Sequence, residues 1–74
     1  MNLQRKFGLV LKRIRKEKGF SQESLANTAD IDRTYVSDIE KGERNISLRI
    51  IEKLCNTLQV SLSEFFNQIE NYNE

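Results

Sequence analysis

Residues 21–42 read SQESLANTADIDRTYVSDIEKG and carry the clearest structural signal in the chain. Ser21 is a favourable N-cap for a first helix, which we expect over residues 22 to about 28. Asp32 caps a second helix over about 33–41, and a glycine follows it, the residue that most readily ends a helix in the left-handed conformation. The few residues between these helices leave room only for a tight turn. The stretch therefore predicts two short helices that cross at a steep angle.

The second of these helices has a polar side and an apolar side on a helical wheel. The polar arc holds Arg33, Thr34, Ser37 and Lys41, with Asp38 at its edge. The opposite side holds Tyr35, Val36 and Ile39. An arginine in the first turn of such a helix can bind guanine O6 and N7 in the DNA major groove, and a threonine methyl group can touch thymine. A solvated polar face is the alternative, and this helix alone leaves both interpretations open.

Three further helices flank this pair. Leu3, Phe7, Leu11 and Ile14 form an apolar stripe that predicts a helix over 3–18. Serine caps at positions 47 and 61 open two more, and the last of them begins with the capping-box pattern Ser61 to Glu64. No segment alternates in the manner of a strand. The sequence predicts an all-α fold, a compact five-helix domain over 1–69, and a frayed tail over 70–74.

Composition excludes most catalytic chemistry. The chain has 74 residues, no His and one Cys, which rules out an intramolecular disulfide, a Cys/His zinc site and every His-dependent triad. The carboxylates are scattered, so we expect no enzymatic activity, no metal and no cofactor. The single thiol, Cys55, falls on the apolar stripe of the fourth helix and is expected to pack in the core. No leader or membrane span is visible, which predicts a cytoplasmic protein with no membrane partner.

Charge is distributed unevenly along the chain. The net charge is only +1, but residues 1–19 hold seven Lys and Arg side chains against Glu17, a balance of +6. Such an asymmetry is typical of a surface that attracts an anionic partner, and it is also found in solvated basic helices. Charge alone leaves the two readings equal.

Four segments together resemble a known family. They are Phe7-Gly8, residues 19–23, residues 32–47 and residues 61–66. The chain from 3 to 69 resembles the phage-repressor and Cro family of helix-turn-helix domains, with the lambda-repressor-like fold in which the second and third helices form the motif. Residues 32–47 more narrowly resemble the controller proteins of restriction-modification systems. This resemblance implies a homodimer that binds a pseudo-palindromic operator on double-stranded DNA beside its own gene and the endonuclease gene.

The resemblance also implies roles for single residues. The base-reading positions are Arg33, Thr34 and Ser37, with Asp38 as a further reader that can accept from a cytosine amine. The DNA-backbone positions are Gln22, Tyr35, Arg44 and Asn45. Arg15 and Glu40 match a structural ion pair that orients the reading helix. Asp30 stands where many members have Gly, and Asp tolerates the left-handed backbone better than most residues.

Apolar residues of the last helix predict a partner surface. Phe66 and Ile69, with Ile50 behind them, are the expected dimer interface, because the helix carries more apolar surface than its own bundle can bury. A two-fold dimer would place the reading helices about 34 Å apart. RNA polymerase is a further partner that could convert occupancy into activation. The competing hypothesis is an antitoxin-like or anti-regulator module that uses the same surface to bind another protein.

Overall fold

Five helices account for most of the chain in the computed structural model, which describes residues 1–73. They are α1 (Leu3–Glu17), α2 (Gln22–Ala29), α3 (Arg33–Glu40), α4 (Leu48–Leu58) and α5 (Leu62–Glu70). No strand occurs within the described residues, so the all-α expectation is confirmed. The helices of the predicted motif differ from expectation by one residue each, because α2 includes Ala29 and Lys41 caps the end of α3.

A polar side chain begins each helix by accepting a backbone N–H that the helix leaves unpaired. The capping side chains and the residues whose backbone N–H they accept are Asn2 with Arg5, Ser21 with Ser24, Asp32 with Thr34, Ser47 with Ile50, and Ser61 with Glu64. The reciprocal capping box forms at Ser21, whose backbone N–H donates to the Ser24 hydroxyl at 2.9 Å.

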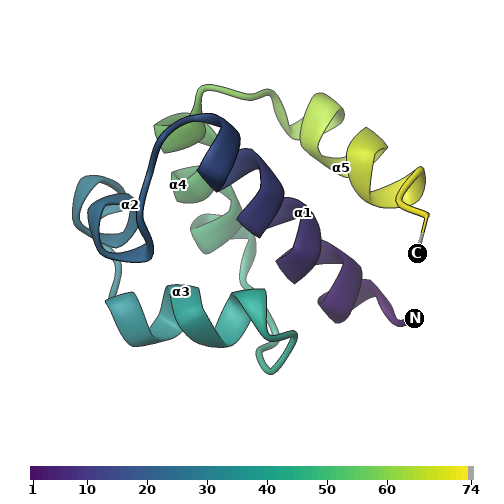
Figure 1. Ribbon diagram of the computed structural model, residues 1–74, viewed down its shortest axis with the longest axis horizontal. Helices are drawn as coiled ribbons and strands as arrows, with labels where there is room; N and C mark the ends of the chain where they lie inside the picture. Colours follow the sequence, from purple (N-terminus) through teal and green to yellow (C-terminus); the bar gives the residue numbers. More distant parts are fainter. Residues whose placement is uncertain (74) are drawn as a thin grey trace.

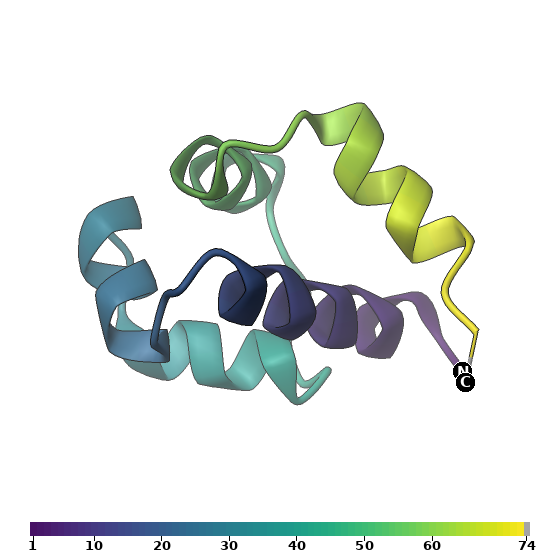
Figure 2. The same cartoon turned by 45° about the horizontal axis from the view of Figure 1, so that its top comes forward.

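The helices surround one core, and α1 runs through the middle of the bundle (Figure 1). α1 packs against α3 and α5, while α2 packs against α3 and α4. In the turned view α3 lies along the lower edge, on the side of α1 away from α4 and α5 (Figure 2). The core consists of Phe7, Val10, Leu11, Ile14, Leu25, Ala26, Val36, Ile39, Ile51, Leu54, Cys55, Leu58, Phe65 and Ile69. This packing leaves the outer face of α3 uncovered.

Two non-glycine residues have a left-handed backbone at helix ends. Asp30 has φ 59°, as expected, and the Ile31 N–H donates to the Ala26 carbonyl at 2.9 Å, which closes the turn of the motif. Gln59, with φ 59°, ends α4 in the same way, and the Val60 N–H donates to the Cys55 carbonyl at 3.1 Å. Nothing in the sequence marked Gln59 for this role.

Gly8 allows α1 to lie directly on the end of α3. A Cβ atom at this position would come within 2.8 Å of the carbonyl oxygen of Glu40 and closer still to that of Ile39. Only a glycine permits this approach. The contact fixes the position of α3 against the rest of the bundle.

Two expectations for the C-terminal part are wrong. Ile69 is 1% exposed, because it follows Phe65 by four residues and shares the stripe that α5 turns to the core. The tail begins one residue later than expected, because Glu70 is the last residue of α5; beyond it, Tyr72 packs against the core with the Arg13 guanidinium 5.5 Å from its ring centre. Glu74, the end of the predicted tail, lies outside the described residues.

Cys55 is 2% exposed in the core, as its place on the α4 stripe predicts. Burial raises the pKa of its thiol above the ordinary value near 9.0. The thiol is therefore neutral and shielded, which agrees with a packing role.

Candidate nucleic-acid interface

The outer face of α3 forms a shallow polar cleft together with the start of α2. Its walls are Gln22, Arg33, Thr34, Ser37, Asp38 and Lys41. The structure thus brings together all four predicted base-reading residues and one predicted backbone contact. Lys41 belongs to the same cleft; it lay on the polar arc of the sequence but had not been assigned a contact.

Two side-chain cations of this cleft are unpaired in the part of the chain that the structure describes. Within residues 1–73, the side chains of Arg33 and Lys41 make no hydrogen bond or ion pair, and both are exposed. The Asp32 carboxylate accepts the Thr34 N–H at 2.7 Å and so fixes the first turn that carries Arg33. A fixed helix end with an unpaired guanidinium is suited to binding an external acceptor.

A buried ion pair joins α1 to the last residue of α3. Arg15 donates through Nε to Glu40 Oε2 at 2.6 Å and through Nη2 to Oε1 at 3.0 Å. Its Nη1 also donates to the carbonyl of Phe20 at 2.9 Å. The two residues are 7% and 9% exposed, so the pairing expected from the sequence lies inside the protein. It holds the orientation of α3 and does not itself face the cleft.

Gln22 couples this buried pair to the surface. Its Nε2 donates to Glu40 Oε1 at 3.0 Å, although the residue also lines the cleft. The sequence predicted a phosphate contact for Gln22 and gave no sign of the bond to Glu40. This bond holds its amide at the rim of the cleft, beside the N-terminus of α2.

The loop after α3 is tied to the helix by Arg44. The Arg44 Nε lies 3.2 Å from Asp38 Oδ2, and its guanidinium carbon lies 4.7 Å from the centre of the Tyr35 ring. The Tyr35 hydroxyl donates to the carbonyl of Asn45 at 3.5 Å. Three predicted contact residues are therefore in contact with one another, and Asp38 is paired rather than free.

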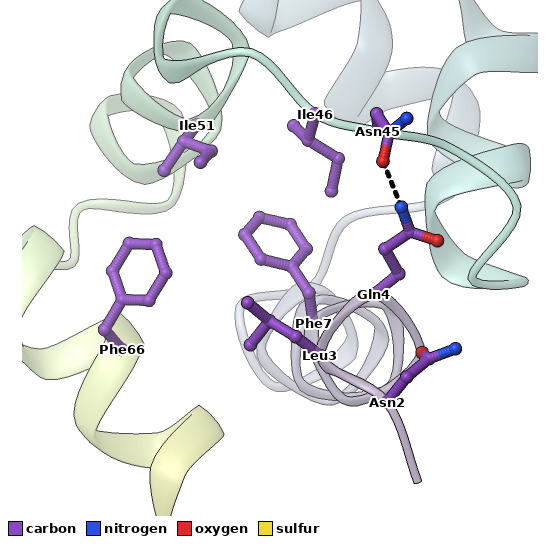
Figure 3. Close-up of a pocket in the computed structure, with 8 residues that line it drawn as sticks. All are labelled: Asn2, Leu3, Gln4, Phe7, Asn45, Ile46, Ile51 and Phe66. Carbon is purple, nitrogen blue, oxygen red and sulfur yellow. Dashed lines mark hydrogen bonds between the residues drawn. The ribbon is translucent and has the colours of Figure 1, made fainter.

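The start of α1 supports the same loop from the other side. The Gln4 amide donates to the Asn45 side-chain oxygen (Figure 3). Both residues line one side of an apolar cleft of about 460 Å³. Leu3, Phe7, Ile46 and Phe66 form much of its wall (Figure 3). Gln4 was not singled out by the sequence, since a lone Gln at a helix start carries no signal for such a contact.

Exposed apolar side chains gather on α4 and α5. Leu48 is 84% exposed and Leu62 is 50% exposed, and together with half-buried Phe66 they line a second depression. We call these three residues the α4–α5 surface. Each leucine is the first residue of its helix, directly after the capping serine, and its side chain there is turned away from the core. Ile50 is half-buried, lies two residues from Leu48 and so faces another side of α4; its part in an interface stays a prediction.

A short helix, a tight turn and a second helix with an open polar face define a helix-turn-helix protein. Residues 11–65 match the model of the helix-turn-helix family. The chain belongs to this family and is a DNA-binding transcription regulator, similar to the controller proteins of restriction-modification systems.

Three relatives document this similarity. Control protein C.MunI of a Mycoplasma species is 53% identical over 66 residues, covering 88% of this chain and 89% of the relative. Control protein C.BamHI of Bacillus amyloliquefaciens is 48% identical over 60 residues, covering 80% and 74%. The tetramer of the restriction-modification controller protein C.Esp1396I, solved in complex with its natural 35 base-pair operator, matches with a TM-score of 0.86 and 40% identity over 95% of this chain and 92% of that chain.

Within residues 1–73, no group of three or more His, Cys, Asp or Glu side chains could hold a metal ion. In the same part of the chain no helix is both long enough and apolar enough to cross a membrane.

Proposed function

We propose that this protein is a restriction-modification controller protein, which binds a pseudo-palindromic operator as a homodimer and regulates its own gene and an endonuclease gene. The observation that carries the proposal is the cleft on α3, where Arg33 is exposed and unpaired on a helix whose position is fixed by Asp32, Gly8 and the Arg15–Glu40 pair. The 53% identity with a control protein supports the same reading.

In this proposal the α3 face enters the major groove. Arg33 binds guanine O6 and N7, while Thr34 and Ser37 contact neighbouring bases. Tyr35, Arg44 and Asn45 lie beside the sugar-phosphate backbone, and Gln22 presents the positive end of α2 to a phosphate. These contacts divide the interface into a part that reads sequence and a part that positions the protein.

The proposed dimer uses the α4–α5 surface. Leu48, Leu62 and Phe66 form an apolar area on α4 and α5. These two helices lie on the side of α1 away from α3 (Figure 2). A two-fold axis through this area would set two α3 helices about one turn of DNA apart, roughly 34 Å. Dimerisation, occupancy of adjacent sites and contact with RNA polymerase are the proposed means of regulation. We place its action in the cytoplasm, with no catalytic role.

In vitro selection tests this function without knowledge of the operator. Purified protein is incubated with a pool of random DNA duplexes, and bound molecules are sequenced after several rounds. We expect enrichment of two short inverted half-sites whose centres lie about 10 base pairs apart, and binding of the enriched duplex that falls steeply with salt. A pool that remains random, together with capture of a protein partner, would favour the antitoxin-like alternative.

A further inference from the structure

The exposed guanidinium of Arg44 already has partners within the protein. Its Nε lies 3.2 Å from Asp38 Oδ2, and its guanidinium lies against the Tyr35 ring. The side chains of Arg44 and Asp38 are 45% and 25% exposed. Both side chains are therefore accessible to solvent, and each can exchange its partner in the pair for a group on a bound molecule.

Asp38 is the one carboxylate in the wall of the α3 cleft, beside the unpaired cations of Arg33 and Lys41. It does not pair with either of them; its ion pair is made with Arg44, six residues along the chain. A carboxylate at this place repels every DNA phosphate that approaches the cleft, and it lowers the positive charge that Arg44 offers to the backbone. On DNA without a suitable base, the Asp38–Arg44 pair therefore opposes binding.

An exocyclic base amine can reverse this effect. Cytosine N4 and adenine N6 donate hydrogen bonds into the major groove, and a carboxylate is a good acceptor for them. Once such an amine binds Asp38, the Arg44 guanidinium can move to a phosphate without leaving a carboxylate unpaired. The same pair that opposes binding on unsuitable DNA then permits two new contacts.

We propose that Asp38 is a specificity-determining residue that acts by holding Arg44 in an ion pair. A base amine of the operator binds Asp38 and so frees Arg44 to contact a phosphate. This inference rests on the proposed function as an operator-binding protein. It assigns Asp38 a penalty against wrong sequences in addition to a contact with the right one, which is a common route to discrimination.

A double-mutant cycle on two DNAs tests the proposal. Asp38→Asn, Arg44→Gln and the double variant are titrated against the selected operator and a scrambled duplex at several salt concentrations. Glu43→Gln is the matched control, because it removes one exposed negative charge from the same loop, and the Glu43 side chain has no ion pair within residues 1–73. Circular dichroism checks that every variant is folded.

On scrambled DNA, Asp38→Asn should bind about two- to fivefold tighter than wild type, the range expected for release of one exposed ion pair, with a salt slope steeper by about one. On the operator it should bind no tighter than wild type, so the ratio of the two affinities falls. In the Arg44→Gln background the gain on scrambled DNA should be clearly smaller, because only the direct repulsion between Asp38 and phosphate is then removed.

Two results would overturn the inference. Equal gains for Asp38→Asn and Glu43→Gln would mean that general charge acts, without the pair. An undiminished gain in the Arg44→Gln background would mean that Asp38 does not act through Arg44. Failure of the proposed function looks different, since wild type itself would then bind operator and scrambled DNA equally.

Discussion

Arg15 of α1 holds both carboxylate oxygens of Glu40, the last residue of α3, in a pair that is almost fully buried. Burial of two charges costs solvation free energy, which their attraction only balances when the geometry is good. The pair therefore contributes orientation more than net stability. It places the α3 face at a fixed angle to the bundle.

Removal of one partner should destabilise the protein strongly. We expect Arg15→Met or Glu40→Leu to lower the free energy of unfolding by about 3 to 5 kcal/mol, because the remaining charge is left buried and unpaired. The double variant should recover much of this loss. Urea denaturation followed by circular dichroism measures it, with Lys12→Met as an exposed control on the same helix. Single variants as stable as the control would show that the pair is not structurally important.

The contact of α1 with α3 depends on Gly8. Replacing a helical glycine with alanine usually stabilises by about 0.5 to 1 kcal/mol. Here the added methyl group meets the backbone of Ile39 and Glu40, so Gly8→Ala should instead destabilise by about 1 to 3 kcal/mol. Thermal denaturation gives the sign directly. An increase in stability would mean that the helices can separate at no cost.

The fold was largely predictable because its signals are local. Ser21, Asp32, Ser47 and Ser61 cap the helices that they were expected to cap, and Asp30 adopts the left-handed turn. Gln59 adopts the same conformation although its residue type does not favour it, and the turn is closed by the bond from the Val60 N–H to the Cys55 carbonyl. Caps and apolar stripes can be read from residue types, whereas a left-handed backbone at a glutamine cannot.

The site was predictable as a set of residues but not as a set of contacts. The helical wheel grouped Arg33, Thr34 and Ser37 correctly, because periodicity defines a face. It could not show that Gln22 binds Glu40 or that Asp38 binds Arg44, since these pairs join different elements. Ile69 was misplaced for a different reason: the prediction grouped it with Phe66, whereas its spacing of four residues from Phe65 puts it on the buried stripe of α5.

Titration of Cys55 should make stability depend on alkaline pH. Burial raises the pKa of its thiol, so the unfolded chain loses the proton at lower pH than the folded protein does. The contribution of the neutral thiol to the free energy of unfolding is complete below its ordinary pKa near 9.0. This contribution is lost as pH rises from that value through the raised pKa of the folded protein. Wild type should therefore lose more stability than Cys55→Ala between about pH 8 and pH 10. Parallel curves in chemical denaturation would contradict this assignment.

The α4–α5 surface should determine self-association. Leu48→Glu places a charge at a highly exposed position, so folding should be unaffected while a dimer through this surface is weakened at least tenfold, about 1.4 kcal/mol. Sedimentation equilibrium measures the association. Ser63→Glu adds the same charge at an exposed position of α5 that does not line the depression, and serves as the control. An unchanged dimer in Leu48→Glu would place the interface elsewhere.

The central claim is that Arg33 of α3 reads a guanine, and the most direct test changes the residue and the base together. Binding is measured by fluorescence anisotropy for wild type and Arg33→Ala on the selected operator and on operators with single guanines replaced, with Lys41→Ala as a control that removes a charge from the same cleft. In wild type, and in Lys41→Ala, loss of one particular guanine in each half-site should cost about 1 to 3 kcal/mol. In Arg33→Ala the same base change should cost almost nothing. An equal penalty in wild type and Arg33→Ala at every guanine would contradict the claim.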